Sequence, residues 1–510
     1  MRTIFLGTRF VVLELENNNN PYYAKEEYEI VINDILYRKN NTNVIGIYDL
    51  EPNQEYEIKA SNESIKVKTR TEVICLHTDL FNPSKDGKTN DTIKLQAAIL
   101  SCPDGGTVYI DKGTYLVTTL FLKSNVNIYL DKDAKLICEY DRLKFPVLPG
   151  LIQNDNNELN LGAFEGQEQD KFASIFTGIG IKNVSVAGQG EIDGMASLGD
   201  WYQNHNQVRI ACRPSGVYLN RCENVTMAGF YIHDTACWNI HPYFSNNLNF
   251  LDLRVENPTW MPTTDGLDPD CCDEVLILGC RFSVGDDCIA IKSGTLDFAK
   301  KYLRACSNIT IRNCYMAQGH GGVVLGSEAS GGINNVTVSH SIFKDTDRGL
   351  RIKTRRGRGR YGKISNIIFD NITMDNVLTP FVVNMFYNMG SNPGHDEYFW
   401  TRKKQIVDET TPLIEDFTFE NIDCKNISYA AGVFLGLPEE PIKSLTFKNV
   451  SFRYNLVAKP GYPVMIEHKK LMVRVGIYCE NVDKLVLDNV IFEGNLGEKV
   501  VTDGNTNLKK

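Results

Sequence analysis

The sequence lacks any hydrophobic run long enough to cross a membrane. No stretch approaches the roughly 18 consecutive apolar residues that a spanning helix needs. The first residues, MRTIFLGTRFVVLELENN, alternate apolar and polar side chains and do not form the uninterrupted apolar segment of a secretory signal. We therefore expect no membrane partner and a cytoplasmic location, or secretion if a signal was trimmed before residue 1.

An excess of positive charge is also missing. Lysine and arginine total 54 against 63 aspartate and glutamate residues, so the formal net charge at pH 7 is −9. An acidic chain is poorly suited to nucleic acid or to an anionic membrane surface as its main partner. If the substrate is an anion, its attraction has to come from a local group of basic side chains. Nothing in the composition indicates an oligomeric state.

Paired cysteines of the kind that bind metals are absent. The chain has 14 cysteines but no C-x-x-C pair. Several of them, such as Cys280, Cys288 and Cys314, occupy or flank apolar strand positions, where a thiol behaves as a small hydrophobic side chain. We expect reduced, structural thiols, and no metal or other cofactor.

The first part of the chain, residues 1–72, contains short strands and no helical pattern. RFVVLELE, YEIVINDILYR, NVIGIYDL and YEIKASN are separated by turn residues, a spacing typical of a small β-sandwich. The stretch YDLEPNQEYEIKAS resembles the end of fibronectin type III domains. We expect residues 1–72 to form a fibronectin type III-like sandwich that packs against the rest of the chain and carries no chemistry.

The remainder, residues 73–510, repeats one short unit. Segments such as NITIRNCYMAQGH from Asn308 and NVTVSHSIFKDT from Asn335 each combine two short alternating strands around a turn, and these two start 27 residues apart. Such a period indicates units that stack because none can bury its own apolar face. We expect an all-β fold, a right-handed parallel β-helix, with longer loops inserted at 138–180 and 375–415.

Three aspartates and a histidine fall at corresponding places in consecutive repeats. One rung of a stacked coil adds about 4.8 Å along its axis, so residues that are distant in sequence meet side by side. Asp265 lies 21 residues before Asp286, which is followed directly by Asp287, and His320 lies in the next rung. The sequence therefore predicts that these four side chains share one groove.

Two basic residues follow in the rung after that. Arg351 and Lys353 form an i, i+2 pair, which projects from one face of a strand, so both can point into the same groove. Such a site suits hydrolysis of a glycosidic bond in an acidic sugar, because one carboxyl must stay protonated and a second must be ionised to activate water. Repulsion between adjacent carboxylates raises one pKa and so keeps a proton available.

Four short motifs carry a resemblance to a known family. TTDGLDPD, GDDCIAIKSG, GHGG and RIK, in this order, resemble the motifs of glycoside hydrolase family 28, the polygalacturonases, and the likeness extends over about residues 75–500. It implies a right-handed parallel β-helix that cleaves α-1,4-galacturonosidic bonds with inversion and without a metal. The roles that it implies are Asp286 as the general acid, Asp265 and Asp287 for water, His320 in support of the acid, and Arg351 and Lys353 for the substrate carboxylate.

One residue departs from the family pattern, since Thr263 stands where the family usually has asparagine. For inversion we expect the acid and the base to stand roughly 6.5 to 9.5 Å apart, which leaves space for water. The other acidic residues of the first motif, Asp268 and Asp270, are interpreted as structural caps. The arginine-rich run from Arg351 to Arg360 is interpreted as a loop-pinning or solvated segment as readily as a subsite.

Finer details of the resemblance favour one branch of the family. SEASGG, DRGLRIKTRRGRGR and the front domain look most like bacterial exo-acting polygalacturonases, in which one end of the groove must be blocked. The insertions at 138–180 and 375–415 are the candidates for that block. Alternative functions are a rhamnogalacturonan or xylogalacturonan hydrolase, a calcium-dependent pectate lyase, or a non-catalytic β-helix that binds polysaccharide.

Overall fold

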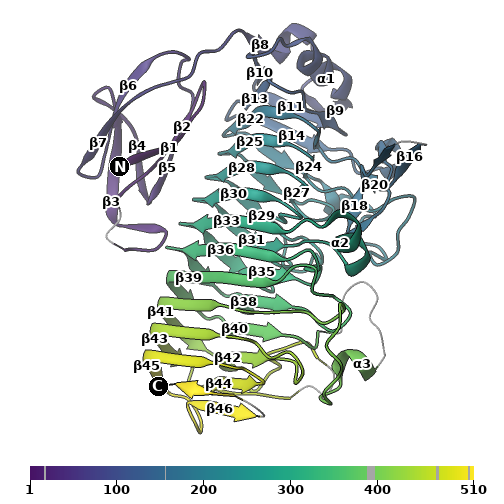
Figure 1. Ribbon diagram of the computed structural model, residues 1–510. Helices are drawn as coiled ribbons and strands as arrows, with labels where there is room; N and C mark the ends of the chain where they lie inside the picture. Colours follow the sequence, from purple (N-terminus) through teal and green to yellow (C-terminus); the bar gives the residue numbers. More distant parts are fainter. Residues whose placement is uncertain (17–18, 155–156, 388–396, 467–469, 504–505, 510) are drawn as a thin grey trace.

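Short strands joined by tight turns build almost the whole chain, as Figure 1 shows. This computed structural model describes residues 1–16, 19–154, 157–387, 397–466, 470–503 and 506–509. The strands form two small antiparallel sheets near the N-terminus and a tall coil of parallel strands beside them. The all-β prediction is therefore confirmed.

The N-terminal strands form a sandwich of two antiparallel sheets, with strand orders β1-β2-β5 and β4-β3-β6-β7. Its strands are β1 (Arg2–Leu6), β2 (Val11–Glu14), β3 (Tyr23–Ile32), β4 (Ile35–Thr42), β5 (Val44–Ile47), β6 (Glu55–Ala60) and β7 (Glu63–Lys68). Between the sheets lies a separate apolar core that includes Leu13, Ile30 and Ile58. A three-plus-four sandwich is the architecture expected from the fibronectin-like pattern.

This sandwich lies against the side of the upper half of the coil (Figure 1). Phe10 and Tyr48 pack on Leu251 and Leu278 of the coil, and Glu14 accepts hydrogen bonds from Arg312 at 2.7 and 3.0 Å. The first strand of the coil's large sheet is β8 (Cys75–His77). We accordingly propose residues 1–72 and 73–510 as the two domains.

The coil contains three strands per turn along most of its length. Two belong to one long parallel sheet and the third belongs to a second sheet on another face. Three successive turns illustrate the pattern. The first contains β25 (Glu223–Ala228), β26 (Tyr231–His233) and β27 (Ile240–Tyr243), the second contains β28 (Asn246–Leu251) and β29 (Arg254–Glu256), and the third contains β30 (Asp273–Leu278), β31 (Arg281–Val284) and β32 (Ile289–Ile291). Strands of the large sheet pair in parallel with their counterparts in the next turn, so the parallel β-helix expectation is confirmed.

Lower turns continue the same pattern. Their strands are β33 (Cys306–Arg312), β34 (Tyr315–Gln318), β35 (Val323–Gly326), β36 (Ile333–Ser339), β37 (Ile342–Lys344), β38 (Arg348–Lys353), β39 (Ile364–Asp375), β40 (Thr379–Asn384), β41 (Phe417–Ile427), β42 (Ala430–Leu435), β43 (Leu445–Tyr454), β44 (Val475–Glu480), β45 (Leu485–Glu493), β46 (Val500–Asp503) and β47 (Leu508–Lys509). From β39 downward, two of the three strands merge into one longer strand.

Repeated asparagines explain the regular turns. Asn308, Asn335 and Asn366 occupy the same place in three turns, and all have φ between +54° and +56°. Asparagine tolerates this left-handed conformation better than most residues. Their amides also form a ladder, in which Asn335 donates to Asn308 at 3.0 Å and Asn366 donates to Asn335 at 2.8 Å. The asparagine that begins many sequence repeats thus sets both the turn and the stacking.

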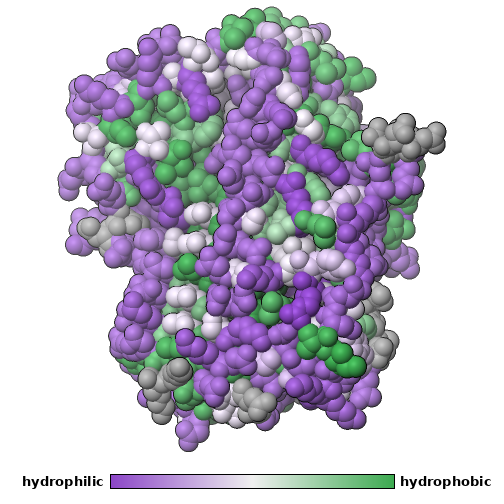
Figure 2. Space-filling model, viewed as in Figure 1, coloured by the Kyte–Doolittle hydropathy of each residue, from purple (hydrophilic) through white to green (hydrophobic). Residues whose placement is uncertain are grey.

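A helix closes the upper end of the coil. In α1 (Thr92–Ser101), Leu95, Ala98 and Ile99 are buried against the first turns of the coil. Its other face exposes Ile93 and Leu100, and hydrophobic residues gather at this end in Figure 2, while the rest of the visible face is mainly hydrophilic. The remaining helices, α2 (Leu296–Tyr302) and α3 (Glu397–Trp400), lie in loops beside the second sheet.

Three loops extend outward on the side of the second sheet. Residues 138–180 hold three antiparallel strand pairs. Two are hairpins, β16 (Ile152–Asn154) with β17 (Asn157–Leu159) and β18 (Ala163–Phe164) with β19 (Gln167–Glu168), and the third, β15 (Val147–Leu148) with β20 (Lys171–Phe172), encloses them. The insertion at 375–415 carries α3, and part of it, 388–396, lies outside the described residues. A third loop, 455–474, was not predicted.

All 14 cysteines are free, and every one except Cys75 is buried. They act as small apolar side chains in the stack, as predicted. Among the helices of the described residues, none has the length and hydrophobicity that a membrane crossing requires.

Candidate functional site

The predicted site residues lie on successive rungs of the second sheet. Asp265 stands in a turn whose Leu267 bridges to Ile240 of β27 and to Ile289 of β32. Asp286 and Asp287 stand just before β32, separated from it by Cys288, and the backbone N–H of Gly266 donates to the Asp287 carbonyl at 2.9 Å. Parallel pairing therefore fixes the aspartates next to one another.

The other predicted residues follow on the next two rungs. His320 precedes β35, and its backbone N–H donates to the Asp286 carbonyl at 3.0 Å. Arg351 and Lys353 lie on β38, which pairs with β35. The structure thus brings all six residues together, in the order that the sequence predicted.

Asp287 is the electrostatic centre of the group. Lys353 donates from Nζ to its Oδ2 at 2.7 Å, and Arg351 donates from a guanidinium nitrogen to its Oδ1 at 3.2 Å. Burial alone would raise the pKa of Asp287, but the charges of Lys353 and Arg351 outweigh it and hold that pKa well below its usual range. Asp287 is ionised, with the i, i+2 pair of cations directed at it as the strand geometry predicted.

A glycine leaves room for this contact. A Cβ at Gly321 would lie 2.4 Å from Cγ2 of Val324 and 3.2 Å from Oδ1 of Asp287. The absence of a side chain at Gly321 is therefore required first by Val324 and second by Asp287, which gives the GHGG motif a steric reason at this position.

Asp286 pairs with His320. The Nδ1 atom of His320 lies 3.4 Å from Oδ1 of Asp286, and the backbone N–H of Thr263 donates to Oδ2 at 3.1 Å. The hydrogen bond with Asp286 raises the pKa of His320. Burial opposes ionisation of Asp286, but its hydrogen bond with the histidine and the nearby positive charges prevail, so the pKa of Asp286 is lowered.

The carboxyl that retains a proton is Asp265. Burial, followed by the negative charges of Asp268 and Asp286, holds the pKa of Asp265 well above its usual range. The sequence predicted that one carboxyl of the group would have a raised pKa, without fixing which one. Burial and repulsion raise the pKa of Asp265, whereas His320 and Lys353 favour the ionised form of Asp286.

The three carboxylates are also closer than predicted. One oxygen from each of Asp265, Asp286 and Asp287 lies within 4.8 Å of the other two, whereas we expected roughly 6.5 to 9.5 Å between acid and base. A water molecule that forms two hydrogen bonds of about 2.8 Å at a tetrahedral angle bridges oxygens about 4.6 Å apart. Two carboxylate oxygens near the limit of 4.8 Å would accommodate one water between them.

Asp268 is not a structural cap. It is fully buried, and neither of its carboxylate oxygens has a hydrogen-bond partner among the described residues. Burial raises the pKa of Asp268 well above its usual range despite the opposing charge of Lys292. The cap interpretation was wrong because the turn satisfies its own backbone through the adjacent strands, as in the bond from the Asp268 N–H to the Ile240 carbonyl at 2.8 Å.

Sequence reasoning missed several neighbours of the site. Arg213 donates to the Thr263 hydroxyl at 2.7 Å, and the Sδ atom of Met465 in the third loop lies 2.7 Å from Arg351. Lys292, in the GDDCIAIKSG motif, has its ammonium 3.9 Å from Asp265 and 3.8 Å from Glu328. Arg213 and Met465 carry no local signal, whereas Lys292 could have been found by following the outward positions of the same strand.

The arginine-rich run pins loops. Arg356 is fully buried and forms an ion pair with Glu439 at 2.5 Å, and Arg360 pairs with Glu440 at 2.9 Å. Arg358 lies 3.4 Å from Glu328. These pairings support the loop-pinning interpretation of the run over a surface for a polyanion.

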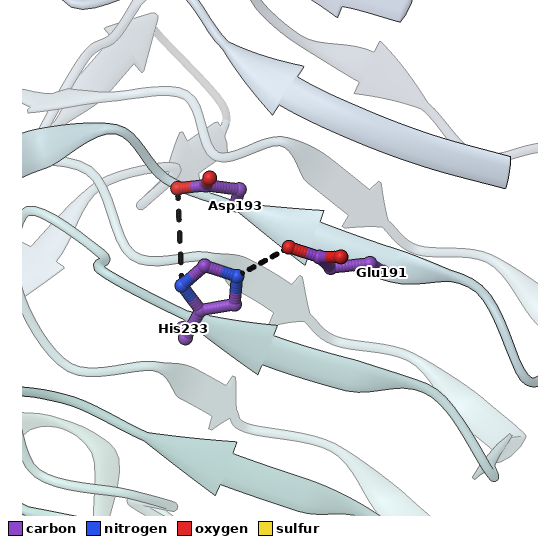
Figure 3. A group of neighbouring side chains, drawn as sticks. All are labelled: Glu191, Asp193 and His233. Carbon is purple, nitrogen blue, oxygen red and sulfur yellow. Dashed lines mark hydrogen bonds and ion pairs between the residues drawn. The ribbon is translucent and has the colours of Figure 1, made fainter. Parts of the chain in front are cut away.

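Among the residues that the structure describes, two groups of side chains have the composition of a cation site. Asp265, Asp286 and Asp287 form one of them, but Asp287 is already balanced by Arg351 and Lys353. The other group lies higher on the coil and comprises Glu191 and Asp193 of β23 (Glu191–Asp193) and His233 of β26, drawn in Figure 3.

The group in Figure 3 is balanced by a lysine. The His233 ring lies between the two carboxylates, with Nε2 2.8 Å from Glu191 and Nδ1 3.9 Å from Asp193. The ammonium of Lys135 contacts the same carboxylates at 2.8 and 3.1 Å. This arrangement is a charge network on the outer face of the coil, on a different sheet from Asp286.

The hairpin between β18 and β19 reaches the edge of the site. The backbone carbonyl of Gly166 at its tip accepts from the N–H and the hydroxyl of Thr295, both at 3.1 Å. A Cβ on Gly166 would lie 2.7 Å from Cγ of Glu328, so the tip and Glu328 are in contact. Phe164 stacks on Trp238 with ring centroids 4.8 Å apart. The insertion at 138–180 therefore walls one side of the site.

Comparisons with known proteins agree with this geometry. Residues 157–460 match the family described as Glycosyl hydrolases family 28. A probable polygalacturonase of Vitis vinifera is 26% identical over 387 residues, which is 74% of each chain.

Two solved structures share the fold. A family 28 exopolygalacturonase of Yersinia enterocolitica superposes with a TM-score of 0.70 at 18% identity, over 99% of this chain and 97% of that one. A hyperthermoactive exopolygalacturonase of Thermotoga maritima gives a TM-score of 0.64 at 23% identity, over 82% and 92%.

Proposed function

The chain belongs to glycosyl hydrolases family 28 and is a glycoside hydrolase, and on that premise we propose that it hydrolyses α-1,4-galacturonosidic bonds of polygalacturonate or its oligosaccharides. The observation that carries the proposal is the convergence of Asp265, Asp286 and Asp287 with two buried cations on consecutive rungs. The carboxylates can serve hydrolysis of the bond, and Arg351 and Lys353 can hold a uronate carboxylate.

Exposure distinguishes the roles of the aspartates. The side chain of Asp286 is 24% exposed, against 6% for Asp265 and 1% for Asp287. We therefore assign Asp286 as the group that faces the glycosidic oxygen, with the exposed His320 as its proton partner. A proton on His320 Nδ1 passes to Asp286 and then to the leaving oxygen as the bond from that oxygen to the anomeric carbon breaks.

The remaining carboxylates act on water. Asp287 is ionised, so it can take a proton from the water whose oxygen bonds to the anomeric carbon. Asp265, once ionised, accepts the second hydrogen bond of that water. The rise of activity with pH on the acid side of the optimum, the acid limb, then follows the loss of the proton from Asp265. A water held between the two carboxylates attacks from the side opposite the leaving oxygen, which corresponds to inversion.

Stereochemistry gives a direct test of that last step. Proton NMR of the first product formed from polygalacturonate should show the β-anomer of the new reducing end. An initial α-anomer would show retention and would reassign one aspartate as a nucleophile.

We propose attack from a chain end, because the hairpin tip at Gly166 closes the site on the side of Thr295 and Glu328. Replacing residues 163–168 by a short glycine-serine turn should open that side. Chromatography over time should then change from one short product to a mixture of oligomers. If the wild-type enzyme already releases a mixture, attack is internal and the hairpin has another role.

The main test separates hydrolysis from its rivals. Hydrolysis of polygalacturonate should release reducing ends with no new near-ultraviolet absorbance and without loss of activity in chelator. A calcium-dependent lyase would give an unsaturated product and would stop in chelator. Binding without product would identify a polysaccharide-binding protein, and cleavage of rhamnogalacturonan or xylogalacturonan in preference to polygalacturonate would identify one of the other hydrolases.

A further inference from the structure

Lys292 is a buried cation that has no role in the mechanism proposed above. It directly follows β32, and its side chain is 4% exposed. Its backbone bridges to Asp270 in the rung before it. The strand register places it beside Gly326 in the next rung, and Gly326 pairs with Lys353 in the rung after that. Because Gly326 has no side chain, nothing on the rung between them separates Lys292 from the space that Lys353 and the aspartates share.

Its ammonium is shared between two carboxylates at longer than hydrogen-bond distance. Nζ lies 3.9 Å from Oδ2 of Asp265 and 3.8 Å from Oε2 of Glu328, and 4.7 Å from the centre of the Trp238 ring. Within the described part of the chain, no acceptor forms a hydrogen bond with this ammonium. Lys292 is therefore a charge placed between two acids, not a group locked to one of them.

Glu328 has partners of its own. It lies 3.4 Å from Arg358 and accepts a hydrogen bond from the Ser327 hydroxyl at 2.6 Å. The charges of Lys292 and Arg358 overcome its burial and lower the pKa of Glu328 to about 2, so it is ionised. The negative charge of an ionised Glu328 partly cancels the stabilisation that Lys292 gives to the ionised form of Asp265.

Other charged groups also face Lys292. The residues around it that titrate or carry charge are Asp265, Asp268, Asp270, Asp287, Glu165, Glu328, His241 and Lys353. Only Asp265 and Glu328 lie within 4 Å of its ammonium. Asp268 interacts with Lys292 as well, but it has no part in the proposed mechanism, so we expect changes at Lys292 and Glu328 to act on the reaction through Asp265.

We propose that Lys292 is a positioning residue for the hydrolysis, which sets the pH at which Asp265 ionises, and that Glu328 sets how much of its charge Asp265 receives. The inference rests on the proposed function. On this proposal, the Lys292–Glu328 pair adjusts the pH dependence of the reaction through Asp265 and does not contact the substrate.

Two substitutions should shift the pH profile in opposite directions. Lys292→Met removes the cation, so the acid limb of kcat/KM should move to higher pH by about one unit or more. Glu328→Gln removes the carboxylate that partly neutralises Lys292, so the acid limb should move to lower pH. KM at the optimum should stay close to the wild-type value in both variants, because the ammonium of Lys292 lies between the carboxylates of Asp265 and Glu328.

An exposed ion pair supplies the matched control. Lys300 and Glu409 lie 2.7 Å apart at the surface, with side chains 35% and 58% exposed. Lys300→Met and Glu409→Gln should leave both limbs in place. The double variant Lys292→Met/Glu328→Gln, which removes both charges of the buried pair, should have an acid limb between those of the single variants.

The outcomes separate this inference from the function on which it rests. No cleavage of polygalacturonate by the wild-type enzyme rejects the proposed function. Cleavage by the wild type, with limbs that do not move or that move in the same direction in both variants, rejects the role of Lys292. If Lys292→Met does not fold, Glu328→Gln still decides, since an acid limb that stays in place or rises contradicts the proposal.

Discussion

Lys353 donates a hydrogen bond of 2.7 Å to Asp287, across 66 residues of sequence. The contact exists because each turn of the coil returns the chain to the same face, so two rungs separate the strand of Lys353 from the turn of Asp287. It also determines chemistry, since the cation keeps Asp287 ionised in a buried place where a carboxylate would otherwise be protonated.

Replacing the proton donor should stop the reaction but not the binding. Asp286→Asn keeps the shape of the side chain and removes its titratable proton. We expect kcat to fall by about 10²-fold to 10⁴-fold, the usual contribution of general acid catalysis, while oligogalacturonate still binds in a calorimetric titration. Turnover at the wild-type rate would remove Asp286 from this role.

The cations should matter for stability as well as for substrate. Arg351→Ala leaves Asp287 with only one of its two cationic partners, in a site where Asp287 is fully buried. Breaking a buried pair typically costs about 3 to 5 kcal/mol, and retention of Lys353 places the expected loss toward the lower end. Urea unfolding at pH 7 should show it.

The same variant should bind a charged substrate less well. In Arg351→Ala, KM for polygalacturonate should rise, and added salt should weaken wild-type binding in the same direction. Arg254→Ala is the matched control, because Arg254 forms an exposed pair with Glu256 on the other sheet. Equal cleavage of fully methyl-esterified substrate by the wild type would contradict the cationic role of Arg351.

Asp268 should make stability depend on pH. Its folded pKa is raised, so the folded state holds a proton that the unfolded chain loses above about pH 4. The free energy of unfolding should therefore lose a contribution as the pH rises from the unfolded pKa toward the folded pKa. Asp268→Asn lacks this titration, so its stability relative to wild type should improve between pH 4 and pH 7.

Unfolding in urea at several pH values measures this difference. Asp297→Asn on α2 is a suitable control, since Asp297 lies in the first turn of a surface helix. A difference between Asp268→Asn and wild type that does not change with pH would contradict the raised pKa.

Thr263→Asn should stabilise the turn that holds Asp286. Thr263 has a φ of +59°, a conformation that a β-branched residue adopts at a cost and that asparagine tolerates. The hydrogen bond from its backbone N–H to Asp286 does not depend on the side chain. We expect a small rise in Tm, reduced by loss of the contact between Arg213 and the hydroxyl. Thr264→Asn, at a position whose side chain bonds to Met261, should instead lower Tm.

The fold and the membership of the site could be read from the sequence because both follow from the repeat. Once the turns stack, Asp265, Asp286 and His320 must meet, whatever the loops do. The chemistry was less accessible. Which aspartate keeps the proton depends on the distances to His320 and Lys353, and a spacing in sequence fixes the rung but not those distances.

The contacts that irregular segments make with the site escaped prediction for a related reason. Met465 reaches Arg351 from the loop between β43 and β44, which has no repeat pattern of its own. Arg213 reaches Thr263 in the same way, across 50 residues. Contacts of this kind depend on the path of an irregular segment, so neither composition nor periodicity predicts them.

The asparagine ladder has one more consequence. A column such as Asn308, Asn335 and Asn366 joins each turn to the turns directly above and below it, and nearest-neighbour stacking of this kind makes the number of residues in an outward loop almost independent of the scaffold. Loops such as 138–180 can therefore lengthen, shorten or be exchanged while the spine beneath them is unaltered. Substrate preference in such an architecture can diversify without refolding.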